Sequence, residues 1–337
     1  MIQQSIERAK AGEDLSMDEM SEVMNVVMRG ECPDDEIAQL LTALHDKGES
    51  EDEVAGAAAA LRRHMTPIKS TRTDLLDTCG TGGDRSGTFN ISTAAALVIA
   101  AAGVPVAKHG NRGITSKSGS ADVLGALGVN IDADVATVQK CLDQLGICFC
   151  FAPLMHPSMK HVSTVRRQLG TPTIFNLLGP LCNPAGAPYQ LLGVGRPELR
   201  GRLSAALHRL GTRRAAVVCG SDGLDEVTLT GATHVSLVTA DGIEDQQWEP
   251  ADFGIASNSL ESLLVEGPEP SAAMIRDILD GQAGAARDIV LLNAAAALWT
   301  AEQCTELREG TARAAEAIDS GAARSLLQRL SEVSRSC

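Results

Sequence analysis

The chain has 337 residues, 44% of them hydrophobic, which is enough for one large core or for two smaller ones. Aromatic residues make up only 2% of the chain, and 29 basic residues stand against 43 acidic ones, a formal net charge of −14. Because nucleic-acid binding relies on aromatic stacking and on neutralising phosphates, this composition disfavours a nucleic-acid partner.

The nine cysteines are scattered along the sequence and form no CxxC pair. An odd, scattered set is typical of reduced thiols, so we expect a cytoplasmic protein. The first ten residues are polar and do not resemble an export signal. The longest apolar run, residues 94–107, is interrupted by Gly103 and Pro105 and is too short to cross a bilayer. We therefore expect no membrane partner.

Residues 1–66 are predicted to form an all-helical domain. Ser16 with Glu19, and Ser50 with Glu53, fit the capping box that satisfies free amide groups at a helix start. Between these boxes, methionine and valine recur at helical spacing at positions 17, 20, 23, 24, 27 and 28. We interpret this methionine stripe as core or as a self-association face.

After Pro67, short apolar runs alternate with helical windows. The strand-like runs are 75–76, 104–107, 129–131, 147–151, 191–194, 215–219 and 235–238. Alternation of this kind predicts an α/β class, with a mostly parallel central sheet flanked by helices, formed here by residues 67–152 and 189–337. Residues 153–188 are rich in proline and predict a crossing segment, part of which joins the helical domain, or an active-site loop.

Charge is distributed unevenly along the sequence. Residues 78–170 carry eight basic and five acidic side chains, so this stretch is cationic within a strongly acidic chain. Because a ligand responds to the local field more than to the net charge, the cationic stretch favours a small anionic ligand.

A glycine-rich turn, GTGGD (80–84), follows the predicted strand at 75–76 and precedes an alanine-rich helix. Backbone amides in such a turn can converge on a phosphate, and the helix dipole adds to the attraction. The turn is neither a dinucleotide-binding nor a Walker loop, because Arg85 replaces the third glycine and no GK[ST] follows. Taken alone, a turn of this kind is as often purely structural.

Two further polar loops are expected beside the glycine-rich turn. KHGNR (108–112) follows the next predicted strand, and KSGSAD (117–122) begins another helix. Ligands of α/β proteins bind outside the carboxyl ends of the strands, where lysine supplies charge and serine and asparagine supply directional hydrogen bonds. The alternative interpretation of residues 118–122 is a plain helix cap.

Six motifs occur together in the order and at the spacing typical of the anthranilate phosphoribosyltransferases. They are GTGGD (80–84), NIST (90–93), KHGNR (108–112), KSGSAD (117–122), TIFNLLGPLCNPA (173–185) and GLDE (223–226). The sequence resembles that family over most of its length. The resemblance implies a fold like that of the class II nucleoside phosphorylases, with a small helical domain and a larger α/β domain.

The resemblance also implies a Mg²⁺-dependent pentosyltransferase. The family transfers the phosphoribosyl group of 5-phosphoribosyl diphosphate to the amine of anthranilate and releases diphosphate. The product, N-(5-phosphoribosyl)anthranilate, is that of the second step of tryptophan synthesis from chorismate. Carried over to this sequence, the residues expected to bind the phosphoribosyl donor are Gly80, Gly83, Asp84, Thr88, Asn90, Ile91, Ser92, Thr93, Lys108 and Ser120.

The remaining expected site residues concern the acceptor and the metal. Those implied for anthranilate are Gly80, His109, Asn111, Arg166, Gly179 and Pro180, of which His109, Asn111 and Arg166 are implied to be catalytic. Those implied for Mg²⁺ are Ser92, Asp225 and Glu226, since this ion prefers oxygen ligands. On sequence alone, an Asp-Glu pair is more often a solvated surface pair, a lone histidine more often a hydrogen-bonding wall, and Arg166-Arg167 an exposed helix end.

Two positions depart from the family's pattern. Pro172 stands where the family usually has arginine, which removes a charge beside the expected acceptor side. Gly125 stands where the family usually has glutamate, within a predicted helix, at a cost of about 1 kcal/mol relative to alanine.

Two other functions are considered. A pyrimidine nucleoside phosphorylase of the same fold is disfavoured, because KHGNR and GLDE replace the signatures of that enzyme. A non-catalytic relative that binds nucleic acid is disfavoured by the net charge, the few aromatic residues and the intact Asp225-Glu226 pair. The resemblance and the methionine stripe together predict a homodimer through the first helices.

Overall fold

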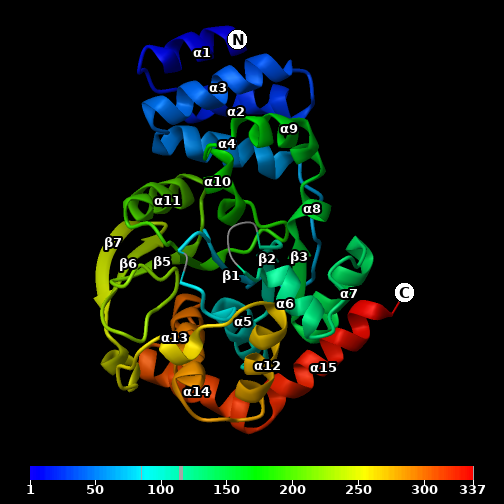
Figure 1. Ribbon diagram of the computed structural model, residues 1–337, viewed down its shortest axis with the longest axis vertical. Coiled ribbons are helices and arrows are strands. Elements are labelled where there is room, and N and C mark those ends of the chain that lie inside the picture. The colour runs from blue at the N-terminus through cyan, green and yellow to red at the C-terminus, as the bar shows by residue number, and fades with distance from the viewer. Residues whose placement is uncertain (85, 114–116, 337) are drawn as a thin grey trace.

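The computed structural model describes residues 1–84, 86–113 and 117–336 (Figure 1). Arg85, which belongs to the cationic stretch, and Ser116, which directly precedes KSGSAD, lie outside these residues, as does Cys337. The eight cysteines that are described are free thiols, and all except Cys79 are buried. None of the helices in the described ranges has the length and apolar character needed to cross a membrane.

Four helices at the N-terminus form a bundle at one end of the molecule (Figure 1). They are α1 (Ile2–Lys10), α2 (Met17–Met28), α3 (Asp34–Lys47) and α4 (Glu51–Arg63). Both expected capping boxes are confirmed: the Ser16 and Ser50 hydroxyls each accept a backbone N–H at 3.3 Å, from Glu19 and Glu53 respectively. These boxes fix where α2 and α4 begin.

The methionine stripe of α2 is core. Met20, Met24 and Met28 are almost completely buried, and α2 packs along α4. Only Met17, at the start of α2, is partly exposed, so the stripe gives little support to self-association through the first helices.

The α/β domain is built on one seven-stranded sheet in the described residues, with the order β3-β2-β1-β4-β5-β6-β7. The strands are β1 (Leu76–Gly80), β2 (Val106–Gly110), β3 (Ile147–Phe151), β4 (Tyr189–Gly193), β5 (Arg214–Gly220), β6 (Thr233–Thr239) and β7 (Gly242–Trp248). β1 to β5 run parallel, whereas β6 and β7 are antiparallel. The mostly parallel sheet is confirmed.

Two expectations for the strands need correction. Residues 129–131 form no strand; they form the connection between two helices, and Val129 is apolar because it packs into the core beside α15. The serine hydroxyls of α15 hold this connection, since Ser331 donates to the Gly128 carbonyl and Ser334 accepts from the Asn130 amide. Strand β7 was not expected, because its side chains are mostly exposed and polar and give no apolar pattern.

The sheet is covered by helices on both faces (Figure 1). The helices that follow the bundle are α5 (Ile91–Ala101), α6 (Ser120–Ala126), α7 (Val135–Leu145), α8 (Ala152–Met155), α9 (Lys160–Leu169), α10 (Phe175–Leu178), α11 (Glu198–Arg209), α12 (Pro268–Leu279), α13 (Ala285–Thr300), α14 (Leu307–Asp319) and α15 (Ala322–Arg335). The chain from α12 to α15 is helical.

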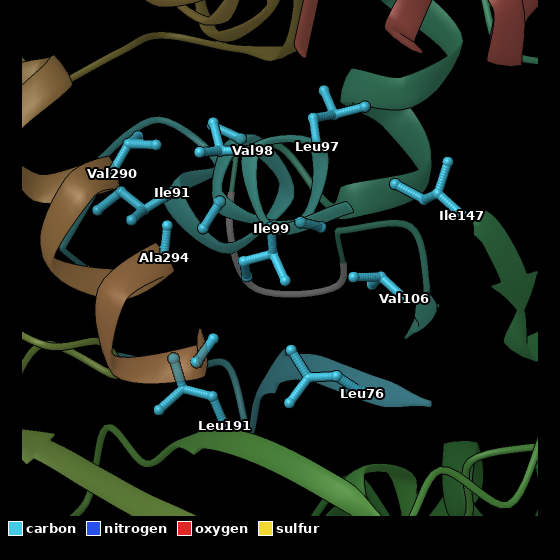
Figure 2. Packing of buried hydrophobic residues seen from close by; sticks show 14 of the residues in the cluster. Leu76, Ile91, Leu97, Val98, Ile99, Val106, Ile147, Leu191, Val290 and Ala294 are labelled. Carbon is cyan, nitrogen blue, oxygen red and sulfur yellow. The ribbon is translucent and has the colours of Figure 1, made fainter. Parts of the chain in front are cut away.

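Helix α5 forms the centre of one hydrophobic core. Its residues are apolar on every side, and most are buried. Figure 2 shows Ile91 close to Val290 and Ala294 of α13, with Leu76 and Leu191 of the sheet below α5 in this view. Because packing on all sides fixes α5, it also fixes the first turn of the helix at the carboxyl ends of the strands.

A second core joins the helical bundle to the opposite face of the sheet. It contains apolar residues of α1 to α4, Val162 and Val165 of α9, Phe175 of α10 and Leu192 of β4. Within the proline-rich stretch 153–188, α9 packs against α2 and α3. The exact division of the chain into residues 1–66 and residues 67–152 with 189–337 stays a prediction.

Candidate active site

The expected ligand loops meet at one edge of the sheet. The glycine-rich turn starts at the end of β1, and GLDE follows β5. KHGNR was expected to follow a strand, but its first three residues are the last three of β2, and only Asn111 and Arg112 lie in the loop. These strands are parallel, and β4 lies between β1 and β5, so their carboxyl ends share an edge. Gly82 of the first loop donates its backbone N–H to Asp225 Oδ2 of the last at 3.0 Å, although 143 residues separate them.

Glycines allow this close approach. A Cβ at Gly80 would lie 2.4 Å from Asp225 Oδ2, and one at Gly193 would lie 1.6 Å from the Asp225 carbonyl oxygen. Gly82 and Gly83 adopt positive φ angles of 67° and 80°, which glycine tolerates best. Gly193 was not among the expected site residues, yet its position at the end of β4 requires the absence of a side chain.

Asp225 and Glu226 form the acidic part of the site. Glu226 Oε1 accepts the backbone N–H of Ser92 at 3.0 Å, at the start of α5. Burial and the nearby Asp84 raise the pKa of Asp225 to about 7, and burial and Asp225 raise the pKa of Glu226 to about 8. Buried Asn293 of α13 holds the end of this loop, since its side chain accepts from the Val227 amide and donates to the Val227 carbonyl.

These side chains suit Mg²⁺. The described residues contain no group of three or more His, Cys, Asp or Glu side chains placed to hold a metal. The expected ligands are two carboxylates and the Ser92 hydroxyl, all of them oxygen ligands, and Mg²⁺ usually completes its shell with water and phosphate oxygens. Burial, and next to it a neighbouring carboxylate, raises the pKa of both groups, so they keep their protons to a higher pH, and a bound cation would favour their ionised form.

The stabilisation of the protein by Mg²⁺ should increase with pH. The unfolded carboxyl groups ionise near pH 4, whereas in the folded metal-free protein Asp225 and Glu226 ionise at about 7 and about 8. The folded state therefore loses stability through these groups as the pH rises to about 8, and Mg²⁺ binds the ionised form. We expect MgCl₂ to raise the unfolding temperature more at pH 8.5 than at pH 6. An equal or larger increase at pH 6 would contradict this expectation.

Lys108 is the buried cation of the site. Its Nζ donates to the Thr78 carbonyl at 2.5 Å and to the Ser92 hydroxyl at 3.2 Å. Burial lowers the pKa of Lys108, and the charges of Asp77, Glu226 and the neighbouring acidic groups oppose that effect. Lys108 therefore lies at the base of the loops, between β1 and the first turn of α5.

The other expected donor residues differ in their placement. Ser86 and Thr88 hydroxyls contact each other at 3.1 Å in the glycine-rich loop, and the Ser120 hydroxyl donates to the Asn111 carbonyl at 3.4 Å.

The side chain of Ile91 packs in the core (Figure 2). Thr93 is buried and lines a small internal void. Ile91 and Thr93 thus contribute to the fold of α5, and their side chains do not join the polar loops.

Three hydrogen bonds hold His109, one of the residues expected to bind the acceptor. The His109 backbone N–H donates to Asp77 Oδ1 at 3.0 Å, and ring Nδ1 donates to the Gly179 carbonyl at 3.1 Å. Because a carbonyl oxygen only accepts, the His109 proton is on Nδ1, and Nε2 accepts from His156 Nε2, 3.1 Å away. His156 was not among the expected residues, because only the fold brings it next to β2.

Arg166, on α9, contacts the segment 175–179, which also contacts His109. Its guanidinium lies 5.3 Å from the centre of the Phe175 ring, and burial lowers its pKa. Gly179 follows Phe175 by four residues, so segment 175–179 contacts both Arg166 and His109. Asn111 is exposed at the end of β2, and its side chain accepts from the Arg112 amide at 2.8 Å. Pro180 is buried, and its carbonyl accepts from Gln190 at 2.7 Å.

The fold and the loops define a glycosyl transferase. The model of the glycosyl transferase family a/b domain matches residues 72–324, and the model of the helical bundle domain of the same family matches residues 3–65.

Comparison with individual relatives shows which family of glycosyl transferases the chain resembles. The chain is 49% identical to anthranilate phosphoribosyltransferase from Rhodopirellula baltica, over 97% of this chain and 96% of the relative. The crystal structure of anthranilate phosphoribosyltransferase from Thermus thermophilus superposes with a TM-score of 0.92 at 44% identity, covering 98% of this chain and 99% of that one. The enzyme from Saccharomyces cerevisiae in complex with PRPP and Mg gives 0.90 at 29% identity, covering 100% and 98%. The chain belongs to the anthranilate phosphoribosyltransferase family.

Proposed function

We propose that the chain transfers the phosphoribosyl group of 5-phosphoribosyl diphosphate to anthranilate, with Mg²⁺ as cofactor. The observation that carries this proposal is the meeting of the glycine-rich loop with Asp225 and Glu226, above buried Lys108. Backbone amides of a glycine-rich loop, a cation and carboxylates at one edge of the sheet suit a sugar that carries a phosphate and a diphosphate.

In the proposed reaction, the bond from ribose C1 to diphosphate breaks through an oxocarbenium-like transition state, and the anthranilate amine forms the new bond to C1 from the opposite face. Diphosphate leaves with the bonding electron pair, and the proton that the amine loses passes to water or to the released diphosphate. Mg²⁺, held by Asp225 and Glu226 with Ser92 in support, supplies charge that neutralises diphosphate. The amides of the glycine-rich loop and Lys108 bind and orient the donor. The proposed donor set also includes Gly80, Gly83, Asp84, Thr88, Asn90 and Ser120. No covalent intermediate is needed.

The proposed role of His109 is that of a wall of the acceptor pocket. Burial and the neighbouring His156 lower the pKa of His109 to about 3, so the ring is neutral at physiological pH. Both ring nitrogens are engaged, one with the Gly179 carbonyl and one with His156. A ring held in this way orients a planar acceptor and has no free nitrogen with which to take a proton.

Replacing Arg166 should weaken acceptor binding selectively. In the proposed function its guanidinium binds the anthranilate carboxylate through a charge-assisted pair of hydrogen bonds. Because these bonds contribute to the affinity for anthranilate, Arg166→Ala should raise the KM for anthranilate about ten- to a hundredfold. The KM for the donor should stay within about twofold. The check is steady-state kinetics with anthranilate varied at saturating donor.

Arg167→Ala is the matched control, because Arg167 is the exposed neighbour on the same helix. It should leave both constants near those of the wild type. If both variants raise the KM for anthranilate equally, Arg166 is not the acceptor ligand.

A homodimer and a cytoplasmic location complete the proposal. The dimer rests on the family resemblance, since the methionine stripe is mostly buried within one chain. Light scattering at micromolar concentration should give twice the mass of the chain, and a monomer would refute the dimer.

The experiment that tests the function identifies the product. Purified protein with anthranilate, 5-phosphoribosyl diphosphate and MgCl₂ should yield N-(5-phosphoribosyl)anthranilate by mass spectrometry, with one diphosphate released for each product. Incubation of the same protein with thymidine or uridine and inorganic phosphate should release no base. Release of base without transfer to anthranilate would favour the pyrimidine nucleoside phosphorylase instead.

A further inference from the structure

Asn90 is placed at the start of α5 but does not cap this helix. It occupies the N-cap position, and its side chain accepts no hydrogen bond from the first turn. Asparagine at an N-cap normally makes that bond, which stabilises the helix start. The Asn90 side chain is therefore used for another purpose.

That side chain joins loops that are distant in sequence. Asn90 Nδ2 donates to the Ser118 carbonyl at 3.2 Å, and Asn90 Oδ1 accepts from the Ser118 hydroxyl at 2.8 Å. The same Oδ1 accepts from the Ser271 hydroxyl at 2.9 Å. One amide group thus connects the end of the glycine-rich loop with the loop before α6 and with α12.

Ser271 makes two hydrogen bonds with Asn90. Besides donating to Asn90 Oδ1, its hydroxyl accepts the Asn90 backbone N–H at 3.0 Å, and Ser271 is completely buried. Buried serine within a helix commonly donates to a carbonyl one turn earlier, as Ser204 does to Arg200 at 2.8 Å. Ser271 instead directs its hydroxyl to a residue 181 positions away.

The segment before α12 supports the same loop. The Phe89 amide donates to the Leu263 carbonyl and the Val265 amide to the Gly87 carbonyl, each at 2.9 Å. Glu266 pairs with Lys117 at 2.6 Å, so this segment also contacts the loop before α6. The backbone around Asn90 is therefore held from the side of α12, and Ser271 is the buried side chain that completes this support.

We propose that Ser271 is a positioning residue of the donor site, and that its hydroxyl orients Asn90 and thereby the phosphate-binding backbone at the start of α5. This inference rests on the proposed function. Ser271 lies in α12, outside the motifs that suggested the site, and acts on the donor through Asn90.

The test compares the steady-state kinetic constants of two variants, each of which replaces a buried serine by alanine. Ser271→Ala removes two hydrogen bonds to Asn90 and should raise the KM for 5-phosphoribosyl diphosphate roughly five- to tenfold. The kcat and the KM for anthranilate should stay within about twofold, a split that a general loss of structure would not produce. Ser204→Ala is the matched control, because Ser204 is equally buried in α11 and should leave all three constants unchanged.

A double-mutant cycle shows whether the effect passes through Asn90. In an Asn90→Ala background only the bond to the residue 90 backbone N–H is left to lose, so Ser271→Ala should change the KM for the donor by about two- to threefold. A full five- to tenfold effect in that background would overturn the proposal, as would equal changes in both KM values or an unchanged donor KM in Ser271→Ala.

Calorimetric titration of 5-phosphoribosyl diphosphate with MgCl₂, without anthranilate, separates the two proposals. Wild-type protein that binds no donor would overturn the proposed function and this inference with it. Wild-type protein that binds the donor only as tightly as Ser271→Ala does would overturn only the role of Ser271. Weaker binding by Ser271→Ala and unchanged binding by Ser204→Ala is the expected result.

Discussion

Replacing Asp225 by Asn together with Glu226 by Gln should reduce kcat/KM at least a hundredfold and, at the same time, raise the stability of the metal-free protein. The loss of activity follows because neutral amides bind Mg²⁺ far more weakly than carboxylates do. The gain in stability follows because the pKa of both carboxyl groups is raised, by burial first and then by Asp84 beside Asp225 and by Asp225 beside Glu226. Their ionisation therefore costs free energy in the folded state. The amides remove that cost.

Activity measured with MgCl₂ and thermal unfolding measured in EDTA at pH 8 check the two effects. At that pH Asp225 is mostly ionised and Glu226 is about half ionised in the wild type, so the difference in unfolding temperature should be larger than at pH 6. The variant should also lose the pH-dependent stabilisation by MgCl₂. A variant that is less stable than the wild type in EDTA at pH 8 would show that ionisation of the two carboxyl groups does not destabilise the folded protein.

Gly193→Ala should reduce activity to a similar degree for a different reason. A Cβ at Gly193 would lie 1.6 Å from the Asp225 carbonyl oxygen. The position of a Cβ is fixed by the β4 backbone, and the oxygen belongs to the Asp225 backbone, so no side-chain rotation can relieve the clash. The loop that carries Asp225 must then move, and a displacement of about 1 Å can cost a hundredfold in rate. We also expect a loss of about 1–3 kcal/mol in the free energy of unfolding, as for other overpacked sites.

Gly125→Ala is the control for this substitution. Gly125 is exposed in α6, and a Cβ there meets no atom within 4 Å. Alanine should leave the kinetic constants unchanged and stabilise the protein by about 0.5–1 kcal/mol, because glycine is a poor helix former. Steady-state kinetics and chemical denaturation of both variants make the comparison. If Gly193→Ala retains wild-type kcat/KM, the close approach of β4 to Asp225 is not required for catalysis.

The sequence predicted the central part of this arrangement because the loops follow parallel strands. Once β1, β2 and β5 are placed in one parallel sheet, GTGGD, KHGNR and GLDE must meet at its carboxyl edge. The fold class followed from the alternation of apolar runs with helical windows, and the capping boxes located the starts of α2 and α4.

Other features depended on contacts that no local pattern announces. His156 and Ser271 are single polar residues whose partners, His109 and Asn90, lie 47 and 181 positions away. Gly193 did leave a signal, since a glycine at the end of a predicted strand indicates close approach of another backbone. Residues 129–131 were wrongly expected to be a strand, because an apolar connection that packs on α15 has the same composition as a short strand.

The most direct test of the account follows the fluorescence of anthranilate on adding purified wild-type protein with 5-phosphoribosyl diphosphate. We predict a steady loss of fluorescence with MgCl₂ that stops when EDTA is added and resumes with excess MgCl₂. Fluorescence that stays constant with MgCl₂, while the donor binds by calorimetry, would contradict transfer to anthranilate and direct attention to Pro172 and Arg166 on the acceptor side. Loss that continues unchanged in EDTA would contradict the magnesium site at Asp225 and Glu226.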